Sequence, residues 1–211
     1  MTFFISFLSG FLAAVIGIFP PGLINMTAAK VKIKEGKRAA IWFVIGAILV
    51  IILQVYLAIL FAQFIGEHPQ VVVLLREIGC GIFTLLTVYF LAIAKAPQKI
   101  KGKIKKQRTS TRFFLGMLLS ALNFFPIPYY VVVSLSLASY GVFAFESFSI
   151  LVFVLGAVLG SFLVFYTYIS FFSKIENKTD FFMKNMNKII GSITGLVALL
   201  TLFNIINYYW N

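Results

Sequence analysis

The stretch Gly17-Ile18-Phe19-Pro20-Pro21-Gly22 interrupts a long apolar segment with two consecutive prolines and a glycine. A second stretch, Asn123-Phe124-Phe125-Pro126-Ile127-Pro128, interrupts an apolar segment in the other half of the chain in the same way. Proline has no backbone N–H and clashes with the carbonyl group four residues earlier, so it breaks or kinks a helix. We therefore expect two apolar helices, the first and the fourth, to be broken at proline.

The composition around both stretches is that of a membrane protein. Hydrophobic residues make up 61% of the 211 residues and charged residues 11%, whereas soluble domains contain about 45–50% apolar and about 25% charged residues. A soluble domain of this size cannot bury so much apolar surface, so the composition excludes that class. The single cysteine, Cys80, excludes an intramolecular disulfide.

Six stretches of the chain carry no charged residue and are long enough to span a bilayer. A spanning helix needs about 20 apolar residues, with a range of about 17–25. Because backbone N–H and C=O groups cannot stay unpaired in hydrocarbon, these spans are predicted to be helices. The expected fold class is an all-α membrane protein with six transmembrane helices. The charge-free stretches are residues 3–29, 39–66, 78–94, 113–145, 147–173 and 189–211.

The connections between these stretches divide by charge. The connections on one side, residues 30–38, 95–112 and 174–188, contain all but one of the 18 Lys and Arg residues, and Arg76 alone lies on the other side. Short loops rich in Lys and Arg remain in the cytoplasm. We therefore expect a multi-pass protein of the plasma (inner) membrane with both termini outside the cytoplasm.

The two halves of the chain align with each other. Matching Gly10 with Gly116 places the two proline stretches on each other without a gap, at an offset of 106 positions. In the second helices Gly46 matches Gly156 at an offset of 110. Because each half has three spans, the second half enters the membrane from the opposite side. The sequence thus predicts two inverted three-helix repeats.

The basic segment 95–112 is expected to link the first repeat, residues 1–94, to the second, residues 113–211. Its charge suits contact with anionic lipid head groups, but a topology determinant and linker needs the same charge, and we favour that interpretation. The expected partners are a small-molecule substrate and membrane lipid, without nucleic acid. The sequence leaves a homodimer open.

Both breaks are predicted near the middle of the membrane, where transporters with broken helices bind their substrates. Carbonyl groups freed by the prolines accept N–H donors, and the N-terminus of the half-helix beyond a break attracts a carboxylate. An amino acid carries both an ammonium and a carboxylate group, so we expect a small zwitterionic solute. The candidate substrate-binding residues are Pro20, Pro21, Gly22, Asn25, Gln54, Asn123, Pro126 and Pro128.

The sequence gives no indication of catalysis, of a bound metal or of a cofactor. The only histidine, His68, precedes Pro69 in an expected outer loop, and the six acidic residues lie at or beyond the expected membrane edges. No metal-ligand cluster, nucleophile–base pair or nucleotide-binding loop can be recognised. We therefore expect a secondary transporter and not an enzyme.

These motifs resemble those of the LysE/RhtB family of amino-acid exporters. The family's Pro-Gly-Pro-type motif late in the first helix corresponds here to residues 17–22, followed by the basic run Lys34-Glu35-Gly36-Lys37-Arg38-Ala39 and by Gly46. Residues 123–126 are similar to the Asn-Pro element of the family's fourth helix. Pro-Pro-Gly replaces Pro-Gly-Pro here, and the acidic residue that many members carry after the second-helix glycine is missing. The resemblance implies a six-helix exporter of small solutes, amino acids among them.

Two alternatives remain compatible with the sequence. One is the export of metal cations or other small solutes. The other is a non-transporting membrane scaffold or assembly factor. A scaffold does not need two matched helix breaks, so it should tolerate their replacement, which distinguishes it from a transporter.

Overall fold

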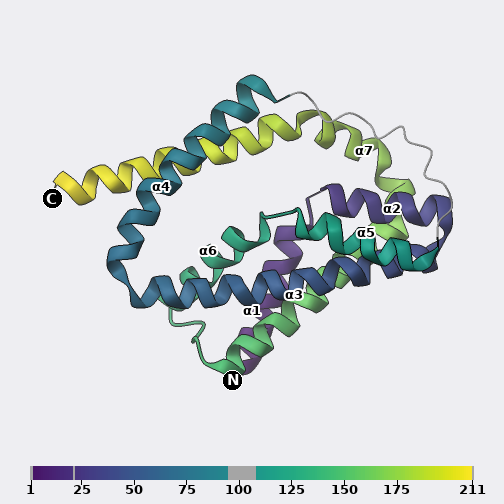
Figure 1. The fold of residues 1–211 in the computed structure, drawn as a ribbon, viewed down its shortest axis with the longest axis horizontal. Helices are drawn as coiled ribbons and strands as arrows, with labels where there is room; N and C mark the ends of the chain where they lie inside the picture. The colour runs from purple at the N-terminus through teal and green to yellow at the C-terminus, as the bar shows by residue number, and fades with distance from the viewer. Residues whose placement is uncertain (1, 21, 95–107, 211) are drawn as a thin grey trace. The chain divides into compact units, whose positions relative to one another are not determined.

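The computed structural model describes residues 2–20, 22–94 and 108–210, and every regular element in this part of the chain is helical. The prediction of an all-α protein is therefore confirmed. The helices are α1 (Thr2–Ile18), α2 (Leu23–Glu35), α3 (Lys37–Glu67), α4 (Pro69–Val88), the π-helical turn η1 (Tyr89–Ile93), α5 (Thr109–Ala121), α6 (Pro126–Ser139) and α7 (Ser147–Trp210), as drawn in Figure 1.

The chain forms two compact units. Unit 1 comprises Met1–Phe64 and Gly102–Ile175, and unit 2 comprises Ile65–Lys101 and Glu176–Asn211. Unit 1 thus contains α1, α2, α5 and α6 together with most of α3 and the first part of α7. Each unit combines segments from both predicted repeats. All described residues of the candidate site lie in unit 1.

The first proline stretch breaks its helix as predicted. Helix α1 ends at Ile18 and α2 begins at Leu23, with an angle of 77° between the two segments (Figure 1). Gly22 precedes α2 in an extended conformation (φ −100°, ψ 176°). Pro21 lies outside the described residues. The apolar stretch 3–29 therefore belongs to two separate helices that meet at a bend.

The second proline stretch starts a helix after ending one. Helix α5 ends at Ala121 and α6 begins at Pro126, at an angle of 60°. A proline at the first position of a helix is tolerated, because the N–H that it lacks has no partner within the helix there. Pro126 and Pro128 therefore favour a new start at α6.

The described part of the chain has three helical segments that are long and apolar enough to span a membrane, and up to five if each bent pair is one span. The three are Lys37–Glu67, Ser147–Phe171 and Ile190–Trp210. The chain is thus a multi-pass membrane protein. The expected third span is a shorter apolar helix, Glu77–Ile93, so a sixth span stays a prediction.

Helix α7 differs from the predicted pattern. The sequence places a basic loop at residues 174–188, whereas α7 continues as a helix through this segment. The segment contains neither proline nor glycine, so no residue in it interrupts the i to i−4 hydrogen bonds. Charge alone predicted the loop, and charge does not end a helix.

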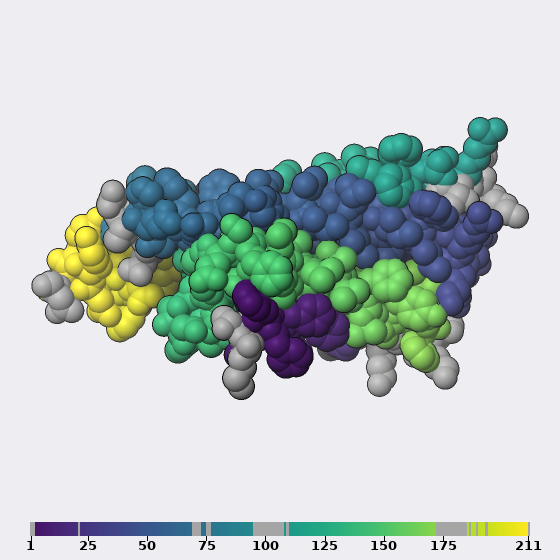
Figure 2. Space-filling view, turned by 90° about the horizontal axis from the view of Figure 1, so that it is seen from below, coloured from purple at the N-terminus to yellow at the C-terminus, as the bar shows by residue number. Residues whose placement is uncertain are grey.

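Glycines bring α1 and α7 into backbone contact in unit 1. A Cβ atom on Gly10 would overlap the backbone oxygen of Phe153, and a Cβ atom on Gly156 would overlap that of Phe7. Small residues permit such close approach between membrane helices. Figure 2 shows α1 (purple) and α3 (blue), from the first half of the chain, lying against green second-half segments.

A second pair of glycines joins α3 to α5. A Cβ atom on Gly46 would overlap the backbone oxygen of Phe113, and one on Gly116 would overlap that of Phe43. These contacts are the repeat counterparts of the α1–α7 contacts. Adding 106 to the α1 residues gives the α5 residues, and subtracting 110 from the α7 residues gives the α3 residues, for the glycines and the phenylalanines alike. Contacts also link α1 to α6 and α2 to α5.

Candidate functional site

Asn25 forms hydrogen bonds to the backbone at the first break. It lies in the first turn of α2, its side chain is buried, and its Nδ2 atom donates hydrogen bonds to the backbone oxygens of Ile18 (2.6 Å) and Pro20 (3.0 Å). Because these carbonyl groups lost their helical partners at the break, Asn25 supplies the donors that the prolines removed.

Tyr168 of α7 completes this set of contacts. Its hydroxyl group donates to the backbone oxygen of Phe19 at 2.8 Å, and the residue is buried. Three consecutive carbonyl groups, those of residues 18–20, thus receive donors from protein side chains. Tyr168 could not be singled out from the sequence, because nothing in its apolar span distinguishes it from the other eight tyrosines of the chain.

Gln54 forms hydrogen bonds to the backbone at the second break. It lies in α3, is 6% exposed, and its Nε2 atom donates to the backbone oxygens of Ser120 (3.1 Å) and Asn123 (2.8 Å). The side chain thus holds the end of α5 and the first residues beyond it. The sequence named Gln54 as a candidate substrate-binding residue without assigning it to either break, and the structure places it at the second one.

The two breaks are braced by helices of the opposite half. Gln54 reaches the second break from the first half, and Tyr168 reaches the first break from the second half. Tyr129 of α6 adds a direct link, because its hydroxyl donates to the backbone oxygen of Ala13 at 2.8 Å. A Cβ atom on Gly17 would meet the Tyr129 ring, so α6 packs closely against the end of α1.

The remaining candidate residues take part mainly through their backbone. Pro20 is exposed, and Gly22 serves as the residue before α2. Asn123 is partly buried and contacts Gln54 through its carbonyl group, while Pro126 is partly buried and Pro128 is exposed. The structure thus groups Asn25 with the first break and Gln54 with the second. The binding role of these residues stays a prediction.

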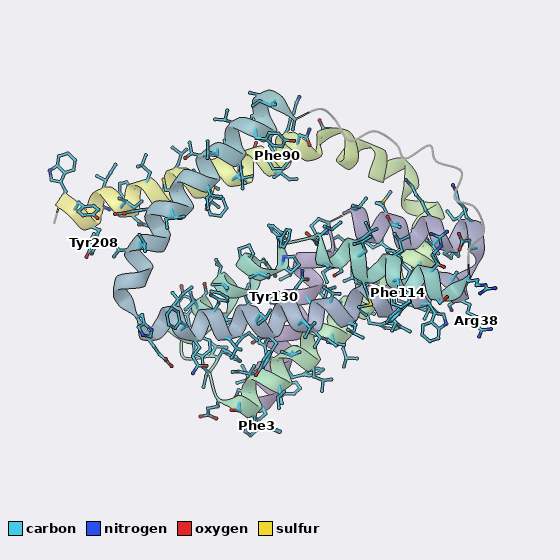
Figure 3. The ribbon with its side chains drawn as sticks, in the orientation of Figure 1. Phe3, Arg38, Phe90, Phe114, Tyr130 and Tyr208 are labelled. Atoms are coloured by element: carbon cyan, nitrogen blue, oxygen red, sulfur yellow. The ribbon has the colours of Figure 1, made fainter. Side chains whose placement is uncertain are left out.

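Several buried polar atoms have no hydrogen-bond partner among the described residues. Two of them belong to the second break, Oε1 of Gln54 and Oγ of Ser120. The others are hydroxyl groups of α6 and the start of α7. Figure 3 labels one of these, Tyr130, whose ring packs 6.3 Å from that of Phe153. These hydroxyls are those of Tyr130, Ser134 and Ser149.

A buried ion pair joins the end of α2 to the start of α5. Arg112 donates from Nε to Oε2 of Glu35 at 2.8 Å and from a terminal guanidinium nitrogen to Oε1. The exposed fractions of the two side chains are 4% and 2%. Gly36 follows with φ +94°, which favours glycine, so the chain turns directly into α3. The pair fixes α2 against α5 at one end of unit 1.

A hollow on the surface of α3 offers no polar group to orient a solute. The hollow, of about 260 Å³, is lined by Leu57, Leu60, Phe61 and Phe64, and its walls are apolar. Among the described residues there is no group of three His, Cys, Asp or Glu side chains that could hold a metal ion. At the two breaks, by contrast, buried side chains of Asn25, Tyr168 and Gln54 meet backbone carbonyl groups.

An all-helical chain with several apolar spans, two of them broken at proline, has the architecture of a membrane transport protein. Comparison with known families agrees with that class. The model of the LysE type translocator family matches residues 15–204, so the chain belongs to this family. No curated protein and no solved structure is significantly similar to the chain. The family assignment identifies the chain as a membrane transporter of small solutes.

Proposed function

We propose that the chain is a secondary transporter that exports small zwitterionic solutes, amino acids above all, across the plasma membrane. The observation that carries the proposal is the pair of broken helices, each braced by a side chain from the opposite half. A broken helix inside a bilayer leaves backbone groups unpaired, which is costly unless protein or ligand satisfies them. Two such breaks are expected where a solute binds.

The internal contacts of unit 1 support two inverted repeats. The glycine contacts of α1 with α7 have their counterparts between α5 and α3, and the α1–α6 contact has its counterpart in α5 with α2. Such interlocked pairs are what a two-fold axis in the membrane plane would produce. In this arrangement the breaks are equivalent, and a solute between them would be reached from either side.

The start of α2 supports a site for the carboxylate group. The first N–H groups of a helix have no partner within the helix. At α2 no side-chain cap replaces that partner. The helix dipole adds partial positive charge at the same place. A carboxylate is the ligand group that such an end attracts.

The distribution of Lys and Arg along the sequence supports one orientation of the chain in the membrane. We infer that the α2–α3 turn faces the cytoplasm and that both termini lie outside. The Arg112–Glu35 pair would then lie at the cytoplasmic end of unit 1. Export proceeds from this end past the breaks to the outer side.

Replacing Pro20, Pro21 and Gly22 together with Ala tests the proposed function. Alanine favours a helix over proline by about 3 kcal/mol and over glycine by about 1 kcal/mol per residue, so the first break should close. We expect normal insertion, because the segment stays apolar, and efflux of preloaded labelled amino acids from vesicles at background level.

Pro69→Ala is the matched control, because Pro69 occupies the first turn of α4 outside both breaks. Its efflux should equal that of the parent protein. Efflux at the parental rate from the triple variant would mean that the breaks serve packing only. The scaffold alternative would then be favoured.

A further inference from the structure

We propose that Oε1 of Gln54 and Oγ of Ser120 form the subsite that receives the ammonium group of a zwitterion without further charge. This inference rests on the proposed function and names the substrate class of the same site. It predicts that neutral amino acids are exported in preference to amino acids with a cationic side chain.

The hydrogen bonds of Gln54 fix the orientation of its amide group. Both atoms that face Nε2 are backbone carbonyl oxygens, those of Ser120 and Asn123, and carbonyl oxygens only accept. A flipped amide would place oxygen against two oxygens. Oε1 therefore occupies the other in-plane position on Cδ, where no described residue donates to it.

Ser120 carries a second buried oxygen without a described partner, its hydroxyl oxygen. Its carbonyl group accepts from Gln54, the residue is fully buried, and its hydroxyl group has no partner among the described residues. A serine within a helix usually donates to the carbonyl group four residues earlier. Two buried oxygens of neighbouring residues thus lack a donor, and burying a polar group unpaired is unfavourable.

The freed carbonyl groups are less suited to this role than the sequence suggested. Those of residues 18–20 accept from Asn25 and Tyr168, and those of residues 120 and 123 accept from Gln54. Oε1 of Gln54 is the buried orphan that can only accept, whereas each orphan hydroxyl can also donate. An ammonium group, with three donors and no acceptor, complements it.

The absence of acidic residues in the sequence of this region defines the charge of the solute. The breaks at residues 17–25 and 120–128, and the α3 stretch at residues 39–66, contain no Asp or Glu. A cation without a counter-charge is strongly disfavoured in a low-dielectric site. The ammonium group of a zwitterion brings its own carboxylate as counter-charge.

The experiment uses the full chain in proteoliposomes. Uptake of labelled leucine is measured with competition by 2-hydroxyisocaproate, which replaces the amino group by a hydroxyl, and by lysine. We expect the parent to prefer leucine over both competitors. Ser120→Ala should raise the KM for leucine roughly tenfold, as expected for the loss of one hydrogen bond to a charged group. The preference over 2-hydroxyisocaproate should fall by a similar factor.

Ser149→Ala is the matched control, because it also removes one buried hydroxyl without a described partner, but at the start of α7. It should keep the parental KM. Gln54→Glu provides an independent variant, since it adds a negative charge at the same place and should shift the preference from leucine toward lysine.

Three results would overturn the subsite. Equal KM changes in Ser120→Ala and Ser149→Ala would do so, and so would an unchanged leucine-to-lysine preference in a folded Gln54→Glu variant. In both cases leucine transport by the parent would leave the proposed function intact. A parent protein that transports neither leucine nor lysine would overturn the subsite and the proposed function together.

Discussion

At the scale of single residues, Arg112 and Glu35 form a buried ion pair between α2 and α5. Both side chains are almost fully buried, and two N–H groups of the guanidinium meet two oxygens of the carboxylate. Arg suits such a planar, two-point contact better than Lys does. The pair offsets the penalty of burying two charges only as long as both partners are present.

Removing one partner should therefore be more harmful than exchanging them. We expect Arg112→Ala and Glu35→Ala each to lower the free energy of unfolding by about 3–5 kcal/mol, because an unpaired charge stays buried. The exchange variant, Glu35→Arg with Arg112→Glu, should recover part of this loss. Thermal unfolding in detergent measures all three.

Lys37→Ala provides the control for this prediction. Lys37 contacts the hydroxyl group of Tyr166 at 2.8 Å in an exposed position, so its loss should cost under about 1 kcal/mol. If the single variants at 35 and 112 are as stable as Lys37→Ala, the buried pair does not hold α2 to α5.

The site residues that the sequence could reveal are those of unusual type. Asn25 and Gln54 are amides within apolar spans, and such residues attract attention without a structure. The carbonyl groups that these amides bind could not be predicted from the sequence, because they depend on how the helices pack. Ser120 and Tyr168 were missed because serine and tyrosine are common in these spans.

At the scale of helices, the breaks follow from the prolines in the sequence. The close helix contacts follow from the small size of glycine. Proline interrupts a helix wherever it occurs in its interior, so the breaks could be predicted from residues 17–22 and 123–128. The continuation of α7 through residues 174–188 could not be predicted from charge. The glycines were recognisable as packing residues, but their partners depend on the arrangement of the bundle.

Gly116→Ala tests the contact of α5 with α3. The added Cβ atom would overlap the backbone oxygen of Phe43, which cannot move as a side-chain tip can. The helices must separate, and we expect a loss of about 1–3 kcal/mol, as for overpacked cores. The readout is the thermal unfolding midpoint in detergent.

Gly79→Ala is the matched control within the same chain. Apart from its chain neighbours and its own helix backbone, no described residue lies within 4 Å of a Cβ atom built on Gly79. Alanine should therefore leave the midpoint unchanged or raise it, because it favours a helix over glycine by about 1 kcal/mol. A midpoint for Gly116→Ala at or above that of Gly79→Ala would contradict the close contact.

At the scale of the whole molecule, the composition of the chain and its basic segments predicted a multi-pass membrane protein. The division into two units was not predictable, because unit 1 joins segments such as α1 and α7 that are far apart in the sequence. Only packing decides such neighbours. The orientation in the membrane stays a prediction that rests on charge.

Cysteine labelling from outside tests this orientation. In a Cys80→Ala background, single cysteines at Ser139 and Arg38 occupy exposed positions on opposite sides in the expected topology. Figure 3 labels Arg38 at the start of α3. A membrane-impermeant maleimide should label intact cells at position 139 and not at position 38. Lysed cells should be labelled at both positions, and the reverse pattern in intact cells would invert the orientation.

The crossed bracing of the two breaks has a consequence for biogenesis. A nascent chain that has emerged only through α3 carries Gln54 before its acceptors in α5 exist, and the backbone oxygen of Phe19 before its donor, Tyr168, exists. Neither half can complete its own hydrogen bonds during insertion, so the final bundle forms only after α7 has been synthesised. If the two halves were expressed from separate genes, we therefore expect cells to degrade either half expressed alone. Both halves should persist when they are expressed together.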